Sequence, residues 1–325
     1  MSSSAYQSEL IRVEGLWFPH ADLILRAENS LFRVYSGILE ARSSVFRDMV
    51  AFPQPSQPES GENVLDGHPV VRLHDLANEV EVFLRAIFDS NFFERSPTPV
   101  DFHAVIGVLR LAHKYDVPYL RRRALSHLDS MYPTNLNDFR DINAGFAQHH
   151  IECQDHGDPI VSLAAIRAAS EVGALWLIPA AGYRLAYDWD AMNEAIPHLQ
   201  PHELKIYPRA QAEFVRATAV THQFLRSLPS ASCGSDACQQ LVSRAYTGLA
   251  NWHGNRFDCD PLAGWVFDFM ERDGSANLCD SCHDTAQKQF QDAQQQFWDA
   301  LPAVFGLPEW DHLLESKREA LDGTT

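Results

Sequence analysis

The spacing of apolar residues changes within the first third of this 325-residue chain, and that change limits the folds open to it. Two short β-prone runs, 22–26 and 31–35, flank a mostly polar connection that suits a hairpin. From 36 to 50, apolar residues recur every three or four positions, which predicts two short helices. After a proline-rich polar loop at 53–62, a third β-prone run at 69–73 precedes helical spacing at 79–88, at 102–113 and from 118 onward. This order predicts a small α+β domain rather than a β-α-β array.

Two blocks of this region carry a family resemblance. The first is Asp22-Leu23-Ile24-Leu25 followed by Phe32, Val34, Ile38-Leu39, Ala41-Arg42-Ser43, Phe46 and Met49. The second is Leu111-Ala112-His113-Lys114-Tyr115-Asp116-Val117 with Leu120, Ala124 and Leu128. Over about 17–132, their order and spacing resemble the opening and the closing helix pair of a BTB/POZ domain.

The resemblance implies a protein-interaction module rather than a catalyst. BTB domains homodimerise, form larger assemblies, or recruit partners such as cullin-type ubiquitin ligase scaffolds and transcriptional co-repressors. By analogy with the family, we expect this chain to bind itself, or other BTB-domain proteins, around Tyr35, Ile38, Leu39, Arg42, Phe46 and Met49.

Three features depart from the family pattern. Tyr35-Ser36 stands where many members have a histidine and a basic residue, so the basic half of the charged pocket of repressor-type members is missing, although Asp22 takes the place of its acidic half. The hydrophobic-x-Glu triplet of cullin-recruiting members is also missing, with Gln57-Pro58-Glu59 as the nearest match. Few residues precede Asp22, so we expect no long N-terminal dimerisation helix. We therefore favour a self-associating scaffold, with a cullin-ligase substrate adaptor and a transcriptional regulator acting through partners as alternatives.

The rest of the chain is predicted to be mostly helical, with a capped helix start at Asp158-Pro159 and helical stretches at 209–228, 285–301 and 308–320. We expect a disordered N-terminus over 1–16, the BTB/POZ-like domain over 17–133 and a helical region over 134–325. With its Ala174-Leu175-Trp176 segment, paired cysteines and terminal Leu301–Trp310 motif, this arrangement resembles BTB-domain proteins common in mushroom-forming fungi.

Four cysteines of the helical region form two close pairs, Cys233-x₄-Cys238 and Cys279-x₂-Cys282. Two chelating thiolate pairs supply the four soft ligands of a tetrahedral zinc site, so we predict a structural Zn²⁺ ion here. His253, Cys259 and His283 are alternative ligands. Unconnected buried thiols, or a redox dithiol at Cys279 and Cys282, are the other interpretations.

Charge and motifs exclude several functions. The net charge is −17, and most of the acidic excess lies after residue 135, so we expect no direct binding to nucleic acid or to membrane surfaces. There is no apolar run of about 18 residues and no signal peptide, which favours an intracellular chain, cytoplasmic or nuclear. The common nucleophile, phosphate-binding, dinucleotide and metalloprotease motifs are missing, so we expect no enzyme.

Overall fold

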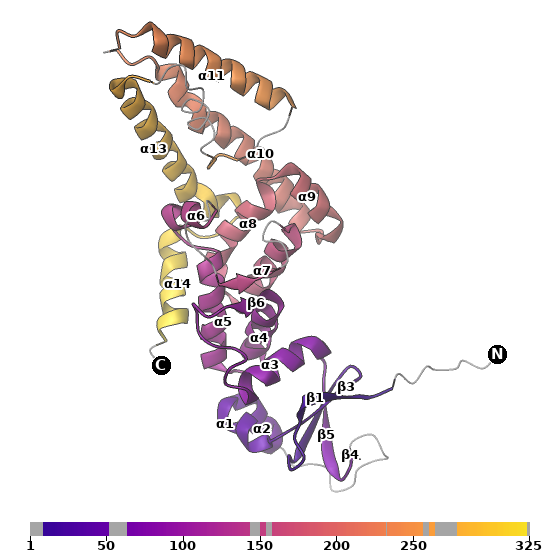
Figure 1. The fold of residues 1–325 in the computed structure, drawn as a ribbon. Helices are drawn as coiled ribbons and strands as arrows, with labels where there is room; N and C mark the ends of the chain where they lie inside the picture. Colours follow the sequence, from indigo (N-terminus) through magenta and orange to yellow (C-terminus); the bar gives the residue numbers. More distant parts are fainter. Residues whose placement is uncertain are drawn as a thin grey trace, which may run out of the picture. The chain divides into compact units, whose positions relative to one another are not determined.

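The computed structural model describes residues 9–51, 64–143, 150–153, 158–231, 233–255, 260–263 and 278–323 (Figure 1), the side chains of 248–255 excepted. The chain divides into two compact units. The first unit comprises 1–131 and 148–154, and the second comprises 132–147 and 155–325. We expected the division between 133 and 134; the structure places it after Met131 and returns a short segment to the first unit.

The first unit is an α+β fold built on a five-stranded sheet in the order β1-β3-β2-β5-β4. Strands β2 (Leu23–Ala27) and β3 (Ser30–Val34) form the expected hairpin, and β5 (His68–Leu73) runs parallel to β2. The remaining strands of the sheet are β1 (Ile11–Trp17) and β4 (Val64–Leu65). The predicted loop at 53–62 lies outside the described residues.

Strand β1 corrects the prediction that 1–16 is disordered. From Ile11 onward the chain pairs in parallel with β3, with Ile11 beside Ser30 and Arg12 beside Leu31. Only Leu16 of this strand is buried, so the pairing depends on backbone hydrogen bonds rather than on a run of apolar side chains. A strand of that kind leaves little signal in the sequence.

Helices of the first unit follow the predicted order. They are α1 (Ser36–Arg42), α2 (Ser44–Ala51), α3 (Ala77–Phe88), α4 (Phe102–Lys114) and α5 (Pro118–Met131). The break between α1 and α2 is fixed by Ser43, whose hydroxyl donates to the Tyr115 carbonyl at 2.5 Å and accepts from the Phe46 N–H at 3.0 Å. Phe46 then stacks on Tyr115, with ring centroids 4.7 Å apart, and so anchors α2 to the core.

A second, two-stranded sheet belongs to the first unit. Strand β6 (Val100–Asp101) pairs in parallel with β7 (Ile151–Glu152), which belongs to the segment that returns from the second unit. The Asp101 side chain also caps α4 by accepting from the Ala104 N–H at 2.9 Å. The strand β6 thus joins the returning segment directly to the start of α4.

The second unit is helical, as predicted for this region. Its α-helices are α6 (Leu136–Asn143), α7 (Pro159–Val172), α8 (Ile178–Ala186), α9 (Trp189–Ala195), α10 (Glu203–Thr221), α11 (Asp236–Asn255), α13 (Asp280–Val304) and α14 (Trp310–Asp322). The 3₁₀ segments are η1 (Leu175–Leu177), η2 (Ile196–His198) and η3 (His222–Ser227). No helix in the described parts of the chain combines the length and apolar character that a membrane crossing requires.

Aromatic side chains form the core that holds α8, α10 and α13 together. Tyr183 packs against Phe214 with ring centroids 5.0 Å apart, and Phe214 lies edge-on to Phe297 at 5.5 Å. The glutamine-rich helix α13 also buries Gln294, whose Nε2 donates to the Pro261 carbonyl at 3.2 Å. That bond fixes the short segment 260–263 on the second unit.

Candidate functional site

The structure brings the four predicted cysteines together at the first turns of two helices. Cys233 and Cys238 lie before and within the first turn of α11, while Cys279 caps α13 and Cys282 lies in its first turn. Their four Sγ atoms all lie within 4.8 Å of one another, and those of Cys233 and Cys279 are 3.7 Å apart. The two pairs, far apart in sequence, therefore form one cluster, which we call the four-cysteine site.

Tight turns set the spacing within each pair. The Cys282 N–H donates to the Cys279 carbonyl at 2.9 Å, so the C-x₂-C pair opens α13 with both sulfur atoms on one side. Each cysteine of the C-x₄-C pair ends a turn of its own. The Cys233 N–H donates to the Ser230 carbonyl at 2.9 Å, and the Cys238 N–H donates to the Ser235 carbonyl at 3.2 Å.

Backbone N–H groups point at the sulfur atoms. The Ser230 N–H donates to Cys282 Sγ at 3.3 Å, the Ser235 N–H to Cys233 Sγ at 3.4 Å, and the Cys279 N–H to Cys238 Sγ at 3.2 Å. Such donors stabilise sulfur atoms that carry negative charge. Three of the four sulfur atoms thus have a backbone donor that would stabilise them in a metal-bound thiolate form.

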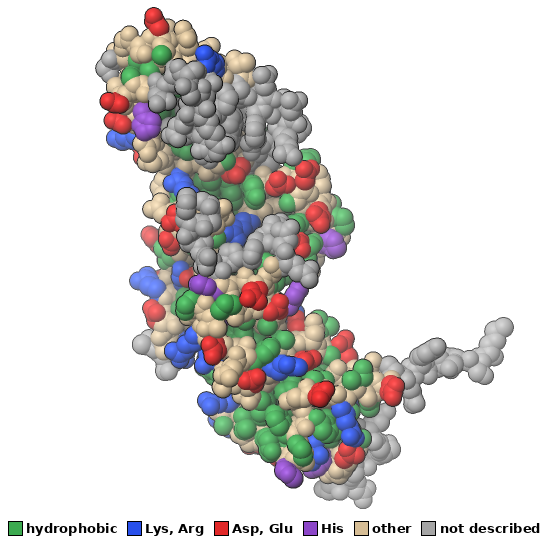
Figure 2. Space-filling view, viewed as in Figure 1, with side chains coloured by type: hydrophobic (Ala, Val, Ile, Leu, Met, Phe, Trp, Pro, Cys, Tyr) green, Lys and Arg blue, Asp and Glu red, His purple; other side chains and the backbone are tan. Residues whose placement is uncertain are grey.

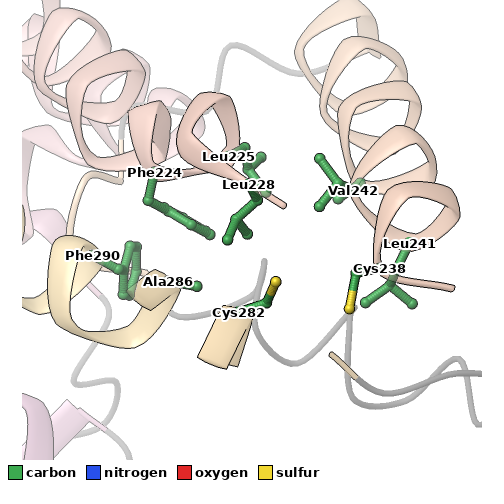
Figure 3. Close-up of a cluster of buried hydrophobic side chains, with 10 residues drawn as sticks. Phe224, Leu225, Leu228, Cys238, Leu241, Val242, Cys282, Ala286 and Phe290 are labelled. Carbon is green, nitrogen blue, oxygen red and sulfur yellow. The ribbon is translucent and has the colours of Figure 1, made fainter. Parts of the chain in front are cut away.

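Two of the cysteines lie in an apolar cluster between η3, α11 and α13 (Figure 3). Cys238 and Cys282 are fully buried, and Cys233 and Cys279 pack against the edge of the cluster. The other members are apolar side chains of these three elements and of the residue that follows η3: Phe224, Leu225, Leu228, Leu241, Val242, Ala245, Ala286 and Phe290. The site therefore joins the starts of α11 and α13 beside the core that these helices share.

The pKa values of the clustered thiols differ because each thiol has different hydrogen-bond partners. Burial opposes ionisation of Cys282, but hydrogen bonds from the Ser230 hydroxyl and N–H outweigh it and lower the pKa to about 7. At Cys233 the Ser235 backbone favours the thiolate, yet burial and the neighbouring thiols raise the pKa to about 12. Without a cation, the Cys282 thiolate forms most readily, while hydrogen bonds with neighbouring thiols and burial raise the pKa of Cys233 and Cys279.

Of the alternative ligands, only His283 has a described side chain. Its Nδ1 lies 3.6 Å from the Asp284 carboxylate, and His283 is not part of the cluster of ligand atoms. The side chain of His253 and the whole of Cys259 lie outside the described residues. Among the residues that the structure describes, the ligand set is therefore the four cysteines that the spacing predicts.

The predicted partner-binding residues do not all face solvent. Tyr35, Ile38 and Arg42 are exposed on or beside α1, and Met49 of α2 is half-buried. Leu39 and Phe46, however, are completely buried, so in this structure these two predicted residues present no surface to a partner. Consecutive residues of a helix point about 100° apart, which is why Ile38 faces out while Leu39 faces the core.

Two exposed apolar residues of the same helix pair were missed. Val45 and Val50 of α2 are each more than a third exposed, as are Tyr35 and Ile38. We call these four residues the α1–α2 face. In the sequence, Val45 and Val50 have the helical spacing of core residues. Only the burial of Leu39 and Phe46 in the structure shows which side of the helix pair faces the core.

Asp22 has a structural role at the start of α1. Its carboxylate accepts from the Ser36 N–H at 2.9 Å and from the Ser36 hydroxyl at 2.6 Å. Partial burial opposes ionisation, but these bonds lower the pKa of Asp22 below its usual value. Asp22 thus holds the first residue of α1 in place.

We compared the chain with models of known protein families, with curated proteins and with solved structures, and none of them matches it.

Proposed function

We propose that this chain is a protein–protein interaction scaffold whose first unit is a BTB/POZ-like domain that self-associates through the α1–α2 face. The observation that carries the proposal is the exposure of four apolar side chains on, or directly before, the consecutive helices α1 and α2. Tyr35, Ile38, Val45 and Val50 are between 36% and 41% exposed. Exposed apolar side chains on one helix pair favour contact with another protein surface.

The order of elements supports the BTB/POZ assignment. The β2–β3 hairpin is followed by α1 and α2, then by β5, then by α3 and the consecutive helices α4 and α5. This is the order that the resemblance implies. The α1–α2 face also lies in the part of the sequence where the resemblance places the self-contact.

Light scattering tests the self-association. The wild-type chain should be a dimer or larger at tens of micromolar protein, and Ile38→Asp should weaken association by at least about tenfold, because a two-fold interface would bury the added charge twice. Val64→Asp is the matched control, since Val64 is an exposed apolar residue of the same unit on β4 and should leave the mass unchanged. A strictly monomeric wild type, or an Ile38→Asp variant that associates normally, would contradict the proposal.

We also propose that the four-cysteine site holds a structural zinc ion. Four thiolates bind zinc at about 2.3 Å, which places neighbouring sulfur atoms about 3.8 Å apart, near the 3.7 Å between Cys233 and Cys279. Four protein ligands leave no open position for a substrate, so the ion would contribute cross-linking rather than catalysis. The backbone donors from Ser230, Ser235 and Cys279 would offset the charge of the four thiolates.

A further inference from the structure

A hollow of about 490 Å³ lies in the first unit where the ends of β2 and β5 meet the start of α3. Its lining includes the side chains of Arg26 on β2, Arg72 on β5 and Leu76 just before α3. It shares no residue with the α1–α2 face. Acidic and basic groups both line it, so its ligand preference depends on which of them already have partners.

Two of its acidic groups are engaged inside the fold. The Glu28 carboxylate accepts from the Ala77 N–H at 2.9 Å and so caps the start of α3. Glu79, in the first turn of α3, accepts from Arg110 of α4 at 2.5 Å. These carboxylates stabilise the fold, and their charge is already compensated by a helix terminus and by an arginine.

The third acidic group is engaged even more fully. Asp75 accepts from Lys114 Nζ and from the Tyr115 hydroxyl, each at 2.5 Å. Its side chain is largely buried by these partners. The lining therefore holds three arginines and three carboxylates, and each carboxylate already has a partner within the fold: the start of α3, Arg110 or Lys114.

The unmatched basic groups are Arg26 and Arg72. They are register partners on the parallel strands β2 and β5, so their side chains lie next to each other on the same face of the sheet. Arg26 Nε donates to the Glu28 backbone carbonyl at 3.1 Å. In the described part of the chain, neither arginine forms an ion pair with a carboxylate. Two adjacent guanidinium groups repel each other unless an anion lies between them.

We propose that this hollow binds a short acidic segment of a partner protein, with its carboxylates on Arg26 and Arg72. Guanidinium groups bind carboxylates through paired hydrogen bonds, which gives the contact a defined geometry. Leu76, half-exposed at the rim, offers a contact for an apolar residue next to the acidic ones. The ligand is thus a peptide that combines acidic and apolar residues.

A polypeptide suits the hollow better than a nucleic acid does. Two arginines match two anionic groups, whereas a phosphate backbone needs a continuous row of cations. Acidic and basic side chains are interspersed on the face of the molecule that Figure 2 shows.

Fluorescence polarisation with the full chain tests this site, using a short labelled peptide of alternating glutamate and leucine. The wild type should bind it, and the affinity should fall as salt is added, because the contact is between exposed charges. The Arg26→Gln/Arg72→Gln variant should bind at least about tenfold more weakly, since it loses two charge-assisted contacts. Arg47→Gln is the control, because Arg47 is an exposed arginine of the same unit, on α2, outside the hollow.

A stability measurement and a nucleic-acid control distinguish the possible explanations of the binding result. An unchanged melting temperature for the double variant would attribute the loss to binding, since both side chains lie at the surface. A labelled single-stranded oligonucleotide should not bind; binding of the oligonucleotide but not of the peptide would overturn the proposal. Equal peptide affinity in the wild type and the double variant, or no peptide binding at low salt, would overturn it too. The light-scattering result for the α1–α2 face is independent of all these outcomes.

Discussion

The four-cysteine site makes a quantitative prediction about the stability of the second unit. The best perturbation is Cys233→Ser/Cys279→Ser, because these two cysteines are only partly buried and serine in their place does not put a hydroxyl into the apolar cluster. The change removes one ligand from each pair. It therefore breaks the cross-link between α11 and α13 and leaves Cys238 and Cys282 in the core.

The size of the effect follows from the loop that the metal closes. Cys238 and Cys279 are 41 residues apart, and Cys233 and Cys279 are 46 apart. A cross-link that closes a loop of this length lowers the entropy of the unfolded chain by an amount worth about 4 kcal/mol. With a urea dependence of about 2 kcal/mol per molar, the unfolding midpoint of the second unit should fall by about 2 M.

The assay combines metal analysis with urea unfolding of the full chain. The wild type should carry one zinc ion per chain, and cobalt in its place should give the intense visible absorption of a tetrathiolate site. Removing the metal with a chelator should lower the midpoint of the wild type to that of the double variant. Cys153→Ser is the control, because Cys153 lies in the first unit, and it should shift neither transition by more than about 0.5 kcal/mol. A wild type that binds no zinc, or a double variant with an unchanged midpoint, would refute the reasoning.

Three further substitutions test the packing, each measured by urea unfolding. Phe46→Ala should destabilise the first unit by about 3–5 kcal/mol because the ring is completely buried; a loss below about 1 kcal/mol would mean that the ring faces outward. Glu203→Gln should destabilise the second unit by about 2 kcal/mol at neutral pH, because two bonds from Arg167 depend on the carboxylate. Burial opposes ionisation of Glu203, but Arg167 lowers the pKa of this carboxyl below the ordinary 4.5. The stabilisation is therefore present above pH 4.5 and is lost as the pH falls through the folded-state pKa. A stability difference between wild type and variant that grows as the pH falls would contradict this. Gly182→Ala should cost about 1 kcal/mol despite its better helix propensity, because the new methyl carbon would lie 2.7 Å from the Phe305 ring; a more stable variant would show that the ring can move aside.

Much of the first unit was predictable because its apolar residues are regularly spaced. The hairpin, β5, the two short helices after the hairpin and helices α3 to α5 follow from the β-prone runs, the polar connections and the spacing of the apolar residues. Strand β1 could not be predicted in this way, because only Leu16 of it is buried. The burial of Leu39 and Phe46 was not predicted for a different reason: the family analogy points to a helix pair but does not say which side of it packs against the core.

The metal ligands were predictable, but their surroundings were not. The two cysteine pairs are visible in the sequence because each has a short, fixed spacing. The N–H donor from Ser230 lies 52 residues before Cys282, and only the folded chain brings them together. Likewise, the pairing of Arg26 with Arg72 depends on the register of two strands separated by the helix pair α1–α2.

The short return of the chain through β7 has a consequence for how this protein is made and how it can be divided. The polypeptide crosses between the two units three times, after 131, after 147 and after 154. During synthesis, the first unit cannot complete its β6–β7 pair until residue 152 has left the ribosome, by which time α6 of the second unit has already emerged. A fragment that ends at 133 would lack β7 and leave the backbone groups of Val100 and Asp101 without their strand partner. Expression of the first unit alone should therefore extend through residue 154, and an exchange of units between proteins at a junction near residue 131 would separate β6 from β7.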